Sequence, residues 1–300
     1  MLLGFCRKLT PIGLITLAFS SSNAIAYTPS DVFTQTERAM AEVNLILKKE
    51  GAAATTKKVG VQKKKSPAHV FGKCIEVVEK VTRLQAKVGV PESTIPSLPF
   101  QKVTPDQVYG CTETVISGLD AVKVKLGIAD KIAEPTPAVK KTPSHVYRNM
   151  WQLSYMLDPL VGQLSPSEVF RNVKAMEEEL ALIGKNKSVN FTGSAAAVSG
   201  KKPSDVLVNC FKGLTLLKKV QRKLDVQALK VPKVPSGDIK PSDVYDCTNM
   251  QLTELHFVKV KLGIHEPRAS IAEMSGKTPS DVFAQMDLYR THLEQLLAKL

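Results

Sequence analysis

The chain of 300 residues lacks the features that mark most membrane-spanning and catalytic proteins. No stretch after residue 26 approaches the ~20 consecutive apolar residues of a membrane-spanning helix. No CxxC or HExxH motif, glycine-rich phosphate loop or nucleophile elbow occurs, and the five histidines are scattered. We therefore expect a protein that does not span a membrane, needs no metal or cofactor and is not an enzyme.

The sequence does contain a six-residue phrase that occurs eight times. The second place is always proline, the fifth is always valine, and the sixth is aromatic in every copy except the one ending at Leu207. A repeat of this kind indicates one structural unit used many times. The copies begin at residues 28, 66, 104, 142, 165, 202, 240 and 278.

Each phrase has the composition of a helix start, because proline is tolerated in the first turn and Ser, Thr or Asp can cap the free N–H groups. The cap could be the first residue, as Thr28, or the third, as Ser30. A heptad pattern of apolar residues follows each phrase and predicts a helix of about 22 residues. Gly184 is expected to cap one helix end, and Asp158-Pro159 is expected to end or kink another helix near Leu157.

The spacing of the phrases divides the chain into two similar halves. The one short interval separates the fourth and fifth copies, and the stretch VKVKLGI occurs in both halves, at 122–128 and 258–264. We predict an all-α protein of eight repeated helices, arranged as two similar four-helix bundle units with long extended linkers. The predicted domains are unit A over 27–164 and unit B over 165–300.

Residues 1–26 have the pattern of a signal peptide. Arg7 and Lys8 precede a short apolar run, and Ala24-Ile25-Ala26 offers small residues before a cleavage point. The mature chain is then expected to start at Tyr27. The resulting prediction is an exported, secreted protein, periplasmic or extracellular.

Four cysteines remain after residue 26, two in each half and 37 residues apart. In an oxidising compartment they would form disulfides, and the duplication favours Cys74 with Cys111 and Cys210 with Cys247. Free thiols packed in the core are the alternative. If these disulfides form, the joined helices run parallel, because the two cysteines of each pair lie at nearly equal distances from their helix starts.

The net charge is +13, and five lysines with no acidic residue lie within residues 57–65. They could contact an anionic surface or polymer, or they could simply be solvated linker residues. The export pattern and the lack of interleaved aromatics argue against nucleic acid. These candidate anion contacts are Lys57, Lys58, Lys63, Lys64 and Lys65.

Side-chain amides recur seven places into the phrase, beside the heptad seam. Asn149, Asn172 and Asn209 could face a ligand inside a bundle, or they could fix the register of neighbouring helices. The function that these observations favour is a non-enzymatic binding or scaffolding module outside the cytoplasm, with a protein or cell-envelope component as partner. The alternative is a ligand-sensing or carrier module that holds a small molecule in the bundle interior.

Overall fold

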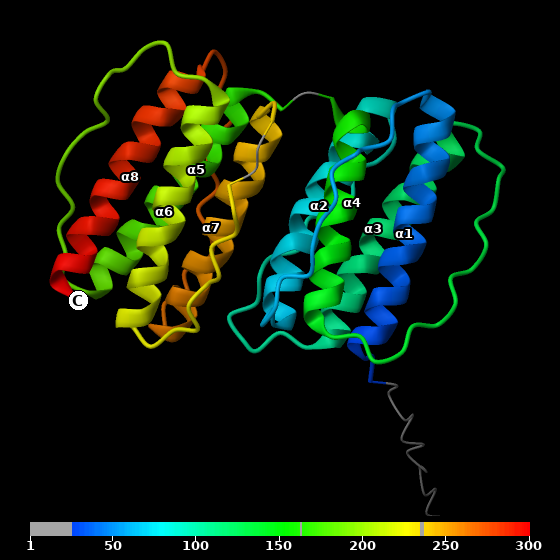
Figure 1. Cartoon of the computed structure of the whole chain (residues 1–300), viewed down its shortest axis with the longest axis horizontal. Helices are drawn as coiled ribbons and strands as arrows, with labels where there is room; N and C mark the ends of the chain where they lie inside the picture. The colour runs from blue at the N-terminus through cyan, green and yellow to red at the C-terminus, as the bar shows by residue number, and fades with distance from the viewer. Residues whose placement is uncertain (1–25, 163, 235–236) are drawn as a thin grey trace, which may run out of the picture.

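The computed structural model describes residues 26–162, 164–234 and 237–300, so the predicted signal peptide lies almost wholly outside it. The described residues form eight α-helices and no strand, as predicted (Figure 1). The helices are α1 (Pro29–Glu50), α2 (Pro67–Val88), α3 (Pro105–Lys125), α4 (Pro143–Val161), α5 (Pro166–Asn186), α6 (Pro203–Lys223), α7 (Pro241–Lys261) and α8 (Pro279–Lys299).

Every helix starts in the same way, which resolves the open question about the cap. The first residue of the phrase is the cap, and the proline is the first helical residue. Thr28 Oγ1 accepts hydrogen bonds from the N–H groups of Ser30 and Asp31, and the Asp31 carboxylate accepts from Thr28 N at 2.7 Å. Where lysine is the first residue of the phrase, its side chain cannot accept a hydrogen bond, and only the bond to the carboxylate forms. Lys202 N, for example, donates to Asp205 Oδ2 at 2.8 Å.

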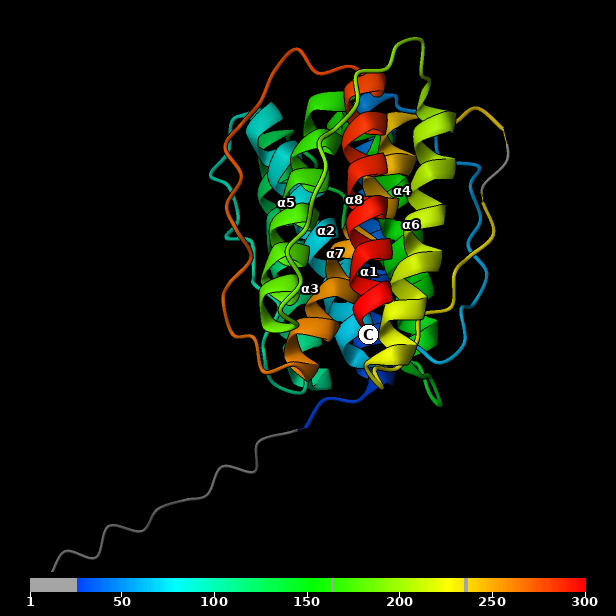
Figure 2. The ribbon, with the colours of Figure 1, turned by 90° about the vertical axis from the view of Figure 1, so that its left-hand side faces the viewer.

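The helices pack in two sets of four, one from each half of the chain (Figures 1 and 2). In the first set α1 packs against α3 and α4, and α2 packs against the same two helices. In the second set α5 and α6 each pack against α7 and α8. Each set is therefore a four-membered ring, and the corresponding helices occupy corresponding places in the two rings.

Within each set all four helices run parallel. Cys74 is bonded to Cys111 and Cys210 to Cys247, with Cα separations of 6.4 and 6.5 Å, so both predicted pairings and the parallel direction are confirmed. Parallel neighbours require each linker to return along the whole bundle. Figure 1 shows the linkers 126–142 and 187–202 doing so on the outside of the two sets.

At four of the eight phrases a lysine just before the phrase binds the next helix of the ring, an arrangement we call the clasp. Lys141 N donates to Ser30 Oγ at 3.0 Å, and Lys141 Nζ lies 4.4 Å from the ring centre of Phe33. The third and sixth places of the phrase thus hold the neighbouring linker. The same clasp joins Lys65 to Ser144 and Tyr147, Lys201 to Ser280 and Phe283, and Lys277 to Ser167 and Phe170.

Two expectations about where helices end were wrong, while the kink that was the alternative at Asp158-Pro159 stays a prediction. The helix α4 does not end near Leu157 but continues through Pro159 to Val161, and Lys87 Nζ donates to the carbonyl of Leu160 at 2.7 Å, which satisfies one carbonyl near the helix end. Gly184 is not a cap, because α5 runs on to Asn186. A side chain at Gly184 would collide with the ring of Phe191, so glycine is required there by close packing.

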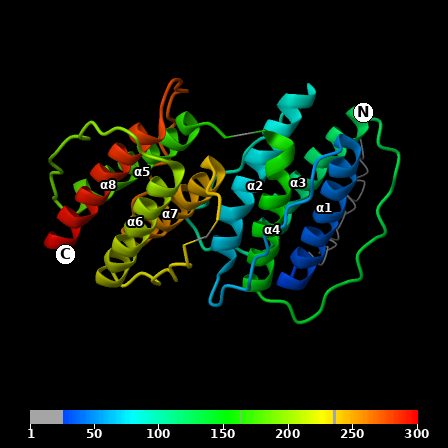
Figure 3. The ribbon, with the colours of Figure 1, turned by 45° about the horizontal axis from the view of Figure 1, so that its top comes forward.

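The two sets meet where α2 crosses α7, and the buried apolar side chains form one connected cluster across all eight helices (Figure 3). His69 lies near Glu254 while Lys80, further along α2, lies near Asp246, so the two helices run antiparallel. The predicted boundary near Leu164 falls in the short connection between α4 and α5. That units A and B are separate domains stays a prediction.

Candidate functional site

The contact between the sets contains a group of buried charged residues, which we call the charge cluster. Lys73, Glu76 and Lys80 come from α2, Asp246 comes from α7, and Asp158 comes from α4. The first four are at most 5% exposed. Charges this deep are stable only when they are paired and hydrogen-bonded.

The two lysines hold the cluster together. Lys80 Nζ lies 2.7 Å from Asp158 Oδ1 and 3.4 Å from Asp246 Oδ1, and it donates to Ser154 Oγ at 2.7 Å. Lys73 Nζ pairs with Glu76 and lies 3.5 Å from Asp246 Oδ1. Lys73 also lies over the ring of Trp151, 3.4 Å from its centre. Each lysine therefore contacts more than one group.

The carboxyl groups of the charge cluster titrate differently. Burial, together with the neighbouring Asp246, raises the pKa of Glu76 to about 8. Burial opposes ionisation of Asp246 as well, but Lys73 and Lys80 outweigh it and lower the pKa of Asp246 to about 2. Near neutral pH the protonated form of Glu76 is therefore favoured, while Asp246 is ionised beside the two lysines.

Beside the charge cluster the two sets enclose a cleft of about 1050 Å³. Its walls are α2, α5, α7 and the linkers 92–100 and 267–274. Several lining residues in the two linkers are exposed, including Glu92, Ile95 and Ser270, so the cleft opens to solvent. Its apolar lining comes from Ile75, Ile95, Leu98, Leu252, Ile271 and Met274.

Charged residues of both signs line the same cleft. Arg83 pairs with Glu168, and Glu79 accepts a hydrogen bond from Tyr245 OH at 2.9 Å. Among the residues that the structure describes, three other charged lining residues have no ion-pair partner. These are Arg171, Glu92 and Glu273.

His256 anchors the linker wall on one side of the cleft. Its Nε2 lies 3.0 Å from the carbonyl oxygen of Pro99, and its ring packs against Phe100 with ring centres 4.9 Å apart. Burial lowers the pKa of His256, so the neutral ring that donates to Pro99 is favoured near neutral pH. The linker is therefore held by side-chain contacts instead of by regular secondary structure.

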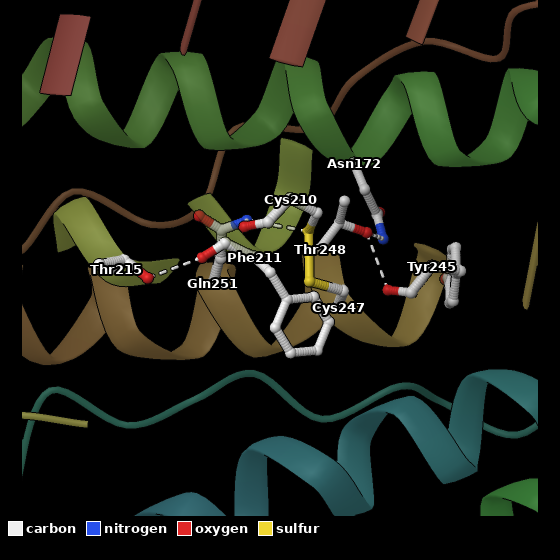
Figure 4. The surroundings of a disulfide bond; sticks show 8 residues. All are labelled: Asn172, Cys210, Phe211, Thr215, Tyr245, Cys247, Thr248 and Gln251. Atoms are coloured by element: carbon white, nitrogen blue, oxygen red, sulfur yellow. Dashed lines mark hydrogen bonds between the residues drawn. A yellow bond between two sulfur atoms is a disulfide. The ribbon is translucent and has the colours of Figure 1, made fainter. Parts of the chain in front are cut away.

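The predicted amides lie in different surroundings. Asn149 Nδ2 donates to Thr36 Oγ1 at 2.9 Å, and Asn209 accepts from Arg290 at 2.7 Å. Asn172 Nδ2 donates to Thr248 Oγ1 at 3.1 Å, beside the disulfide of Cys210 and Cys247 (Figure 4). Asn172 also lines the cleft. These bonds join neighbouring helices near the level of the disulfides.

Of the five lysines predicted as anion contacts, two are engaged with other groups of the protein and three are exposed. Lys57 Nζ pairs with Asp243 at 2.6 Å, and Lys65 is buried in a clasp, where burial lowers its pKa. Lys58, Lys63 and Lys64 are exposed. The hypothesis of an anion contact therefore depends on these three side chains.

Sequence reasoning missed the charge cluster and the cleft. Lys73, Glu76 and Lys80 lie off the heptad seam, where charged residues usually face solvent. A weak indication was present in the same helix, because Ile75 and Val78 are apolar although they also lie off the seam. Such a helix is buried on more than one side, as α2 is.

Comparison with protein-family models, with curated proteins and with solved structures found no match to this chain. No helix in the described ranges is both long and apolar enough to cross a membrane. The argument for a function therefore starts from the geometry of the cleft.

Proposed function

We propose that this protein is an exported, non-enzymatic binding module that holds an extended segment of a partner polypeptide in the cleft between its two helix sets. The observation that carries the proposal is the cleft itself, which has an apolar floor and unpaired charges of both signs. A protein of the cell envelope or its surroundings is the class of partner that an exported module would meet.

The dimensions of the cleft fit a peptide. Its lining runs along α2 from Gly72 to Arg83 and along α7 from Tyr245 to His256. At the helical rise each stretch is about 16 Å long, which matches about five residues of extended chain. The volume of about 1050 Å³ also lies at the upper limit for small-molecule sites.

The charges of the cleft suggest the composition of the bound segment. Arg171 would pair with an acidic side chain or a carboxyl terminus, while Glu92 and Glu273 would pair with basic side chains. Apolar residues between these charges would pack on Ile75 and Leu252. The expected ligand is therefore a short segment with apolar residues and both signs of charge.

Two observations support the location and the lack of catalysis. The two disulfides favour an oxidising compartment, which agrees with the export pattern of residues 1–26. The carboxyl groups with the largest pKa shifts, Glu76 and Asp246, are buried and engaged by lysines. Asp246 pairs with Lys73 and Lys80 across the boundary between the two sets, and Glu76, which also lines the cleft, is engaged by Lys73.

A small molecule is the second candidate ligand, because Asn172 lines the cleft. This alternative places the molecule between the sets, since Asn149 and Asn209, which do not line the cleft, bond to neighbouring groups inside each set. A bound peptide and a bound small molecule are distinguished by native mass spectrometry of protein taken from its source.

The proposal is tested by selecting peptides from a random display library on the wild-type protein and measuring their affinity for charge variants. Arg171→Glu and the double variant Glu92→Lys/Glu273→Lys should each weaken selected peptides at least about tenfold. Matched controls outside the cleft are Arg222→Glu and Glu134→Lys/Glu294→Lys, which should leave affinity unchanged. Equal affinity for cleft and control variants would overturn the proposal.

A further inference from the structure

Tyr27 occupies the clasp position of α1, one residue before the first phrase. Its backbone nitrogen donates to Asp106 Oδ1 at 2.8 Å. Its ring stacks on Tyr109, with ring centres 3.6 Å apart and an interplanar angle of 5°. Asp106 and Tyr109 are the third and sixth residues of the phrase of α3, so Tyr27 makes the same two contacts as the clasp lysines.

The acceptor in this clasp is unlike the others. In the four lysine clasps a peptide N–H donates to a neutral serine hydroxyl, as Lys141 does to Ser30. At Tyr27 the acceptor is a carboxylate. Asp106 is the one acidic residue at the third place of the eight phrases, where the others are Ser30, Ala68, Ser144, Ser167, Ser204, Ser242 and Ser280.

A carboxylate suits a charged donor better than a peptide N–H. The residue bonded to Asp106 is also the one that directly follows Ala24-Ile25-Ala26, the small residues at which an export peptidase would cut. Ala26 and Tyr27 precede the first helix, and Ala26 is exposed. The peptide bond between them is thus accessible and can be cut without breaking any helix.

We propose that the chain is cut between Ala26 and Tyr27, and that Asp106 binds the α-ammonium group that the cut creates. Hydrolysis breaks the peptide C–N bond and adds one water, so Ala26 gains a carboxylate and Tyr27 gains an ammonium group. This group replaces one uncharged N–H donor by a cation with three donors. Processing therefore converts the Tyr27 clasp into an ion pair that fastens α1 to α3.

The first test is the N-terminal sequence and intact mass of protein exported from cells that make the full chain. The expected first residue of the mature protein is Tyr27. A mature protein that starts at another residue, or keeps residues 1–26, would overturn the processing site.

The second test measures the α-amino pKa of the mature protein by NMR after 13C-methylation of its amines. The titratable neighbours of the Tyr27 side chain are Tyr109, Glu113 and Asp106, and Asp106 is the one bonded to the backbone nitrogen. In the wild type the α-amino pKa should lie about half a unit above its value in Asp106→Ser, because the carboxylate stabilises the ammonium form.

The Ser variant keeps the residue type found in the other clasps, so its fold should be preserved. Asp130→Asn, in the exposed linker before α4, is the matched control and should leave the α-amino pKa at the wild-type value. Equal α-amino pKa values in the wild type and Asp106→Ser would overturn the role of Asp106.

Discussion

Lys80 and Asp246 meet across the boundary between the two helix sets, with Nζ 3.4 Å from Oδ1 and both side chains at most 2% exposed. They come from α2 and α7, which cross antiparallel although the helices within each set run parallel. Removal of one partner of a buried ion pair strongly destabilises a protein, because the other charge stays buried without compensation. Loss of either partner should therefore weaken the contact between the two sets.

Replacement of Lys80 by methionine should destabilise the protein by about 3–5 kcal/mol, because the buried carboxyl groups of Asp158 and Asp246 would both lose a counter-charge. Chemical denaturation of the wild type and Lys80→Met measures the effect. Leu216 occupies the duplicate position on α6 and is not part of the charge cluster, so Leu216→Met is the control and should cost under about 1.5 kcal/mol. Similar losses in both variants would contradict the assigned role of Lys80.

The charge cluster predicts a dependence of stability on pH. The folded-state pKa of Glu76, about 8, lies above its ordinary value of 4.5, so folding favours the protonated group. Its contribution is fully present below pH 4.5 and is lost as the pH rises to about 8. Asp158, whose pKa is raised by burial, adds a dependence of the same sign.

Glu76→Gln should remove the Glu76 part of this dependence, because glutamine does not titrate. Unfolding free energies of both proteins at pH 5, 7 and 9 provide the measurement. The stability of the wild type relative to the variant should fall as the pH rises. A constant difference across this range would show that Glu76 is not protonated in the folded protein.

The clasp predicts a coupling between Lys141 and Phe33. Phe33→Leu should cost about 1–2 kcal/mol, since it removes buried contacts and the ring beneath Lys141 Nζ. At the corresponding positions of α7 and α6, the residue before the phrase is Ile239 and the sixth residue of the phrase is Leu207, so both are apolar. Phe33→Leu combined with Lys141→Ile should therefore recover part of the loss, whereas strictly additive effects in denaturation experiments would refute the coupling.

The disulfides should contribute substantially to stability. Each closes a loop with a sequence separation of 37, for which loop entropy gives about 3–4 kcal/mol. Removing one pair by Cys74→Ser/Cys111→Ser should lower the midpoint of denaturation, and added reductant should bring the wild type towards the double variant. An unchanged midpoint would mean that the loop constraint does not operate in the unfolded chain.

The repeat made most of the fold predictable from the sequence. The phrase contains the cap, the first-turn proline and the buried valine of each helix, so eight helix starts follow from local residues alone. The cysteine spacing then gave the pairing and the parallel direction. The predicted helix end near Leu157 was wrong because Lys87 of α2 binds a carbonyl near the end of α4, and no local sequence pattern contains this contact.

The charge cluster and the cleft could not be predicted from the sequence for a similar reason. Lys80 and Asp246 are 166 residues apart in the sequence, and only the packing of the two sets brings them together. The duplicate places on α6 and α3 hold Leu216 and Gly110, so the repeat gives no hint of a charged contact. The cleft likewise needs two linkers, 92–100 and 267–274, that only the packing of the two sets brings together.

Hydrogen–deuterium exchange with a selected peptide tests the location of the binding site most directly. The linkers 92–100 and 267–274 lack regular secondary structure, so their amides should exchange quickly in the free protein and slow down when a peptide fills the cleft. We predict protection in both linkers and none in residues 57–65. Protection confined to residues 57–65, or to the faces of α1 and α3 turned away from the cleft, would contradict a binding site between the two sets.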